Sequence, residues 1–311
     1  MNRSVRPEIQ QCITPGVRTV VCSPHFDDAV LNCWSVLDRE ESCAVVNVFT
    51  GAPGGGFISW YDQLNGALNS AAHMYQRSLE DSHALSVAGK SAINLGLLEV
   101  QYRLRQSRLL HSLFRLVPPV RFAMLRLPFL RTTLYAKPAP GAEQIADAIA
   151  QAVPGATSFC VPAAIGGHRD HVLVRQAGSV LASRGMSVRL YADLPYSVRY
   201  GWPCWISAPE GKRINDRASA YWAWHLEALR LQVGDPIRQA NVVQLTPHER
   251  SRKEVAVRRH VSQMGSLNSG RTRGRLDEDS TFAYEVYWEL PASLGSCPHL
   301  LTSISKSVND A

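Results

Sequence analysis

Short apolar runs alternate with helical patterns along most of the chain, and this alternation constrains the fold more than any other feature. The runs are rich in β-branched residues, and the segments between them carry apolar residues at helical spacing. Strands that alternate with helices form right-handed βαβ units. The sequence therefore predicts an α/β fold, a Rossmann-like and mostly parallel sheet with helices on both faces. The predicted strands are 19–22, 43–49, 91–97, 157–163 and 187–191, and the predicted helices are 29–40, 70–88, 142–152 and 170–184.

The alternation weakens beyond residue 196, where we predict a C-terminal helical and β extension. Its elements are helices at 218–231 and 249–264 and a strand at 282–288. A chain of 311 residues is within the size of one α/β domain. We therefore predict an N-terminal extension over 1–17, a single domain over 18–291 with a basic insertion at 100–142, and a Ser-rich flexible tail over 292–311.

Composition excludes several classes of protein. No apolar stretch approaches the roughly 20 uncharged residues that a membrane-spanning helix needs, and the N-terminal segment lacks the apolar core of a signal peptide. The seven cysteines are an odd number without a CxxC pair, which is typical of reduced thiols rather than of disulfides or zinc ribbons. These features predict a cytoplasmic protein.

The formal net charge of +7 is concentrated in one segment. Eight Arg and Lys residues and no acidic residue lie between residues 100 and 142, so the remainder of the chain is about neutral. A general nucleic-acid-binding surface is therefore not expected. Within 103–137 arginines interleave with Leu and Phe, which favours a lid over the substrate. The alternative is peripheral contact of 103–137 with a membrane or an anionic substrate.

Two polar motifs stand where predicted strands end. Ser-Pro-His-Phe-Asp-Asp (23–28) follows the first strand and Gly-Gly-His-Arg-Asp-His (166–171) follows the fourth. Ligands bind beyond the carboxyl ends of the strands in open α/β sheets. Two imidazoles and one carboxylate are typical of catalytic metal sites, because they leave positions open for water and substrate. His25, Asp28 and His171 fit this count.

Three further polar groups of the motifs are available for catalysis. Asp27 could act as a general base for water, His168 as a proton donor to the leaving group, and Asp170 as the group that holds an imidazole in the required tautomer. Either Asp28 or Asp170 could instead cap the helix that follows it, a role that is compatible with chemistry.

The two motifs resemble those of the PIG-L/LmbE-like zinc-dependent de-N-acetylases. Segments 77–81, 94–97, 193–196 and 262–263 support this resemblance, which extends over about 19–288. It implies hydrolysis of an N-acetyl or other N-acyl group of an amino sugar or glycoconjugate. It also implies a Zn²⁺ ion, with Fe²⁺ as an alternative, bound by His25, Asp28 and His171. Asp27 would then be the base, and His168 the acid that Asp170 supports.

The resemblance also indicates three substrate contacts: Arg77, Glu99 and Tyr196. Arg77 could equally form an ion pair with Glu80 or Asp81 on its own predicted helix. Glu99 stands where relatives often carry an Asp, so the pattern of substrate hydroxyls that it meets is open.

Other functions remain open. One alternative is an amide hydrolase that acts on a secondary metabolite. A Rossmann-like protein that binds a nucleotide or sugar without catalysis is another, but the Gly-rich loop at 51–56 lacks GxGxxG spacing and no helix follows it directly. A covalent route through serine is not expected, since no GxSxG motif occurs.

Overall fold

The computed structural model describes residues 16–54, 57–103, 139–165, 167–199, 233–234, 238–268, 276 and 281–291. These residues form one seven-stranded sheet of order β3-β2-β1-β4-β5-β7-β6. The first five strands are parallel, and β7 and β6 extend the sheet in antiparallel pairing. The strands are β1 (Thr19–Ser23), β2 (Cys43–Asn47), β3 (Ala92–Asn94), β4 (Ser158–Pro162), β5 (Ser187–Tyr191), β6 (Asn241–Gln244) and β7 (Tyr284–Glu289).

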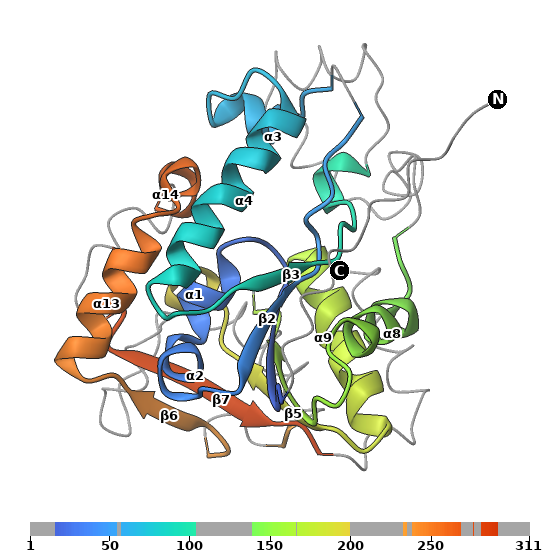
Figure 1. The fold of residues 1–311 in the computed structure, drawn as a ribbon, viewed down its shortest axis with the longest axis vertical. Coiled ribbons are helices and arrows are strands. Elements are labelled where there is room, and N and C mark those ends of the chain that lie inside the picture. The colour runs from blue at the N-terminus through green and yellow to red at the C-terminus, as the bar shows by residue number, and fades with distance from the viewer. Residues whose placement is uncertain are drawn as a thin grey trace, which may run out of the picture.

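Helices lie on both faces of this sheet (Figure 1). One group contains α8 (Ala142–Ala152) and α9 (Arg169–Ser183), which pack side by side, with α9 against β4 and β5. The other group contains α4 (Ser70–Ser86), α13 (Pro247–Val257) and α14 (Val261–Leu267). The shorter helices are α1 (Asp28–Asn32), α2 (Trp34–Arg39), α3 (Trp60–Leu64), η1 (Val100–Tyr102) and α10 (Tyr196–Arg199). The predicted α/β architecture is confirmed.

Strand β1 is buried from end to end and β4 is buried after its first residue, as expected for parallel strands that helices cover on both faces. Close packing of α9 on β4 depends on Gly178, because a Cβ at this position would lie 2.6 Å from Val161 Cγ2. This contact fixes the helix whose first turn carries the second polar motif.

Two predicted helices are interrupted. The helix at 29–40 divides at Cys33, because the backbone amides of Trp34 and Ser35 donate to the Glu285 carboxylate of β7 at 2.7 and 2.9 Å. Glu285 also accepts from the buried ammonium group of Lys253 at 2.7 Å. The helix at 249–264 likewise divides into α13 and α14. Between them lies His260, which is buried and whose Nε2 lies 2.9 Å from the carbonyl oxygen of Phe26. Long-range contacts therefore set both breaks.

The predicted extension over 1–17 lies outside the described residues except for its last two, and the tail over 292–311 and the helix at 218–231 lie outside them entirely. So does most of the basic insertion, from 104 to 138. These assignments stay predictions. None of the helices in the described part of the chain has the length and apolar character needed to cross a bilayer.

Candidate metal centre

The pairing of β1 with β4 brings the two polar motifs together. His25 and Asp27 follow β1, and Asp28 begins α1. His168 directly precedes α9, and Asp170 and His171 lie in its first turn. All six candidate residues of the motifs therefore lie at neighbouring strand ends, as the sequence indicated.

Nitrogen and oxygen atoms converge at this place. Oδ2 of Asp28 lies 3.3 Å from Nδ1 of His25 and 3.3 Å from Nε2 of His171. One ring nitrogen from each of His25, His168 and His171 lies within 4.8 Å of the other two. Two sets of three residues could therefore bind a metal ion. Both contain His25 and His171, and the third residue is Asp28 in one set and His168 in the other.

Buried carboxylates hold the second nitrogen of two of these imidazoles. Nε2 of His25 lies 3.2 Å from Oδ2 of Asp170, and Nδ1 of His171 lies 2.6 Å from Oδ1 of Asp193. A histidine that binds a metal through one nitrogen usually donates its other N–H in this way. By contrast, Nδ1 of His168 is buried without a hydrogen-bond partner in the described part of the protein. Asp170 holds the imidazole of His25 and not, as the resemblance implied, that of His168, because its two oxygens are taken by His25, Val100 and Arg103. Two of the three imidazoles therefore have the carboxylate partner that is typical of a histidine bound to a metal.

Charges at the centre are strongly coupled. Burial disfavours charge on His25 and His171, yet Asp170 and Asp28 hold the pKa of His25 well above its usual value. Asp28 and Asp193 similarly raise the pKa of His171 to about 9. Burial opposes ionisation of Asp28, but the two imidazoles keep the pKa of its carboxyl well below the usual range. The carboxylates of Asp28, Asp170 and Asp193 therefore stabilise positive charge at the position of the two imidazoles.

Asp27 and His168 differ from their neighbours. Burial, followed by repulsion from Asp28, raises the pKa of the Asp27 carboxyl, which makes it a stronger base. Burial and the positive charges on His25 and His171 lower the pKa of His168 to about 3. The ring of His168 nevertheless lies at the centre, with its centroid 4.9 Å from that of His25.

The structure describes all three predicted substrate contacts, and the charges of Glu99 and Arg77 act on His25 and Asp27, respectively. Nη1 of Arg77 lies 2.5 Å from Oε1 of Glu99, so two of them form a buried ion pair. This pair replaces the alternative partners Glu80 and Asp81 that the sequence left open. The Tyr196 ring lies 5.9 Å from the His171 ring and 6.5 Å from that of His168, centroid to centroid.

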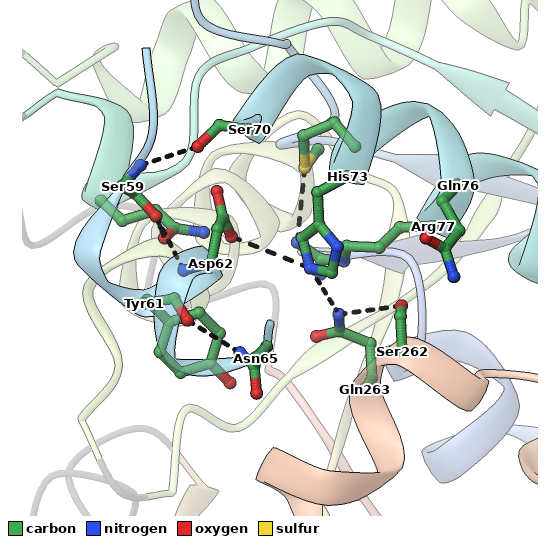
Figure 2. A network of polar contacts seen from close by, with 12 residues as sticks. Ser59, Tyr61, Asp62, Asn65, Ser70, His73, Gln76, Arg77, Ser262 and Gln263 are labelled. Carbon is green, nitrogen blue, oxygen red and sulfur yellow. Dashed lines mark hydrogen bonds and ion pairs between the residues drawn. The ribbon is translucent and has the colours of Figure 1, made fainter. Parts of the chain in front are cut away.

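A polar network fixes the helix face that carries Arg77. Figure 2 shows His73, one turn before Arg77 on α4, between Asp62 of α3 and Gln263 of α14. Nε2 of His73 lies 3.8 Å from Oδ1 of Asp62 and 3.4 Å from Nε2 of Gln263. Asp62 also accepts from the Tyr102 hydroxyl at 2.9 Å. These contacts join α3, α4, α14 and η1 around the Arg77 side chain.

Sequence reasoning did not select three residues of the site. Asp193 belongs to a segment that supported the family resemblance, but its contact with His171 had no signal of its own. His260 lies next to another such segment; its Nε2 lies 2.9 Å from the Phe26 carbonyl oxygen, between His25 and Asp27. Arg103 was assigned to the basic segment, yet its guanidinium lies inside the protein, 2.6 Å from Oδ1 of Asp170.

Gly51, the first residue of the Gly-rich loop, allows two backbone segments to lie close together. It pairs with Leu98, and a Cβ at Gly51 would collide with the Gly96 carbonyl group. Only glycine permits this close approach of two backbones.

Comparisons with known proteins indicate the fold and the family. No family model and no curated protein matches the chain. A solved deacetylase of the teicoplanin biosynthesis pathway is 25% identical, with a TM-score of 0.58 over 88% of this chain and 97% of that chain. The zinc-inhibited form of a teicoplanin deacetylase is also 25% identical, with a TM-score of 0.56 over the same shares.

A third solved structure, a deacetylase of the A40926 pseudoaglycone, shares the fold at 21% identity, with a TM-score of 0.54 over 88% of this chain and 96% of that one. The teicoplanin deacetylases belong to the LmbE/PIG-L de-N-acetylase family. The resemblance that the two motifs indicated is therefore confirmed by solved structures.

Proposed function

We propose that the chain is a metal-dependent N-deacetylase that hydrolyses the acetamido group of an amino sugar, with an amino sugar on a larger secondary metabolite as the preferred substrate. The observation that carries the proposal is the convergence of His25, Asp28 and His171, with a buried carboxylate behind each imidazole. The similarity to deacetylases of teicoplanin biosynthesis, one of them solved with teicoplanin, supports this substrate class.

The donor atoms fit a divalent metal. Nδ1 of His25 and Nε2 of His171 both face Oδ2 of Asp28, and each ring's opposite nitrogen is held by a carboxylate. We assign these three residues as ligands and zinc as the metal, with Fe²⁺ accepted by the same donor set. A metal bound there would polarise the amide carbonyl and lower the pKa of a water molecule towards roughly 7.

Asp27 takes the proton of the attacking water in this proposal. It is adjacent to a ligand but does not need to be one, and its raised pKa suits a general base. His168 then donates a proton to the departing amine. Positive charge on His25 and His171 contributes to its low pKa in the metal-free protein, and imidazoles that bind a metal are neutral. A bound metal would bring its own positive charge to the same place, so His168 would gain a proton only as negative charge develops on the reacting amide.

Arg77, Glu99 and Tyr196 are assigned to substrate binding. The Arg77–Glu99 ion pair presents both a donor and an acceptor to sugar hydroxyl groups. Tyr196 lies against His168 and His171, where the acetamido group would react. These groups orient the amide relative to Asp27 and His168.

Acetate release tests the proposal. The protein is stripped of metal, reloaded with one equivalent of zinc, and incubated with N-acetylglucosamine, with an N-acetylglucosaminyl glycopeptide and with an N-acetylated amine that carries no sugar. We expect equal amounts of acetate and free amine, released fastest from the glycopeptide, and at least about a hundredfold slower release by metal-loaded Asp27→Asn. Hydrolysis of the sugar-free amide alone would favour a general amide hydrolase. Sugar binding without acetate release by the zinc-loaded protein would leave a non-catalytic binding protein.

A further inference from the structure

Arg103 begins the basic segment, but its environment is that of a site residue. Its side chain is only 4% exposed, and its guanidinium carbon lies 5.2 Å from the centroid of the Phe49 ring. Nη2 lies 2.6 Å from Oδ1 of Asp170, and Nη1 donates to the Leu98 carbonyl at 2.9 Å. A planar guanidinium can span a carboxylate and a carbonyl in this way, whereas an ammonium group cannot hold the same fork.

Asp170 divides its carboxylate between two parts of the site. Oδ1 takes the ion pair with Arg103, while Oδ2 contacts Nε2 of His25 at 3.2 Å and accepts from the backbone N–H of Val100 at 2.9 Å. The carboxylate is completely buried. Its orientation is therefore set by these three contacts.

The backbone that Asp170 holds also carries a substrate contact. Glu99 directly precedes Val100, and its carboxylate pairs with Arg77 of α4. The Arg103 guanidinium also donates to the Leu98 carbonyl, which joins the two ends of segment 98–103. A continuous chain of contacts thus runs from Arg77 through Glu99 and Val100 to Asp170 and then to His25.

We infer that Arg103 is a positioning residue that couples the substrate-binding Arg77–Glu99 pair to the metal centre, because it orients Asp170, which in turn holds both His25 and the η1 backbone. This inference rests on the proposed function. Without the guanidinium, the buried carboxylate lacks its charged partner and is free to turn away from His25, so metal affinity falls. The 98–103 stretch loosens at the same time, so substrate affinity falls as well.

Metal titration of the stripped protein tests the inference without recourse to activity. Co²⁺ is titrated into wild type, Arg103→Met, Asp170→Asn and the double variant, and binding is followed by visible absorption. We expect Arg103→Met to weaken Co²⁺ binding about tenfold. In the Asp170→Asn background the same change adds nothing, because Arg103 acts through Asp170. Arg103→Lys, which keeps the charge but not the fork, recovers only part of the affinity.

Arg189→Met is the matched control. Arg189 also pairs with a carboxylate, Glu40, and its guanidinium also lies over an aromatic ring, that of Tyr287, away from the metal centre. We expect this variant to bind Co²⁺ within twofold of wild type. With the zinc-loaded proteins, Arg103→Met should in addition raise KM for the N-acetylated sugar, which the control should not.

Two results would separate failure of the inference from failure of the proposed function. Wild-type Co²⁺ affinity in a folded Arg103→Met protein, or equal losses in both Asp170 backgrounds, would show that Arg103 only anchors the loop. A wild-type protein that binds no Co²⁺ would overturn the proposed function and the inference with it. If Arg103→Met does not fold, Arg103→Lys and its double variant with Asp170→Asn give the same comparison.

Discussion

Asp193→Asn changes one atom behind the metal centre and should weaken metal binding about 10- to 100-fold. Asp193 is completely buried; Oδ2 accepts from the Ile165 N–H at 2.8 Å and Oδ1 contacts Nδ1 of His171 at 2.6 Å. The asparagine carbonyl can replace Oδ2, which leaves its NH₂ group facing His171. Nδ1 must then accept a hydrogen bond from this NH₂ group and carry no hydrogen itself, so the neutral imidazole carries its hydrogen on Nε2, the nitrogen that faces Asp28.

The magnitude follows from the bond that is lost. A hydrogen bond to a charged group contributes about 1.5–3 kcal/mol, and about 1.4 kcal/mol corresponds to a factor of ten in affinity. The structural effect should be small, because the substitution preserves shape. Competition for Zn²⁺ against a chromophoric chelator measures the change.

Asp147→Asn is the control for this substitution. Asp147 pairs with Arg184 at 2.7 Å, and its side chain is 52% exposed, so its removal should leave Zn²⁺ affinity unchanged. Zn²⁺ affinity of Asp193→Asn within twofold of wild type would refute the argument that this carboxylate sets the His171 tautomer.

Three further predictions concern the base, the core and an acidic pH range. Asp27→Asn should retain one metal ion per chain and lose at least about a hundredfold in acetate release; loss of the metal would assign Asp27 to the ligands instead. Gly178→Ala should lower the free energy of unfolding by about 1–3 kcal/mol because its Cβ meets Val161, as urea unfolding would show; unchanged stability would mean that α9 shifts freely. The Arg39 guanidinium, with the Thr246 cap, lowers the pKa of Glu249 from 4.5 to about 2. Glu249 therefore stabilises the folded state above pH 4.5, and its contribution disappears as the pH falls towards 2. Glu249→Gln should lower the free energy of unfolding by about 1–2 kcal/mol at pH 7, a value that allows for the half-exposed Arg39 side chain. The difference in stability between the variant and wild type should shrink as the pH falls from 5 to 3. A difference that does not change with pH would contradict the assignment of this pKa shift to Glu249.

The sequence predicted the sheet and the meeting of the two motifs because both follow from local rules. Apolar runs between helical patterns specify parallel strands, and polar residues at the ends of such strands gather at one edge of the sheet. The convergence of His25, Asp28 and His171 was therefore predictable from spacing and residue type alone.

Contacts between remote segments were not accessible in this way. Arg103 carries the same charge as the arginines that follow it, and only the fold shows that its partner is Asp170. Asp193 and His260 likewise acquire their positions from strand order and helix packing. The edge strand β6 was missed because it is short and mostly exposed, so it lacks the apolar run of the central strands.

The break in the predicted helix at 29–40 also results from a contact between remote segments. Periodicity continues through Cys33, but the Glu285 carboxylate accepts from the amides of Trp34 and Ser35 and starts a new helix there. Glu285 is at least 250 positions away from both amides in the chain, so no local pattern reveals the break.

The metal content of purified wild type, His171→Ala, Asp28→Asn and His168→Ala tests the central assignment most directly. After reconstitution with zinc and removal of the excess, the account predicts about one ion per chain in wild type and in His168→Ala, and little or none in the His171 and Asp28 variants. Loss of the ion in His168→Ala, with retention in Asp28→Asn, would contradict it and assign the metal to the three histidines.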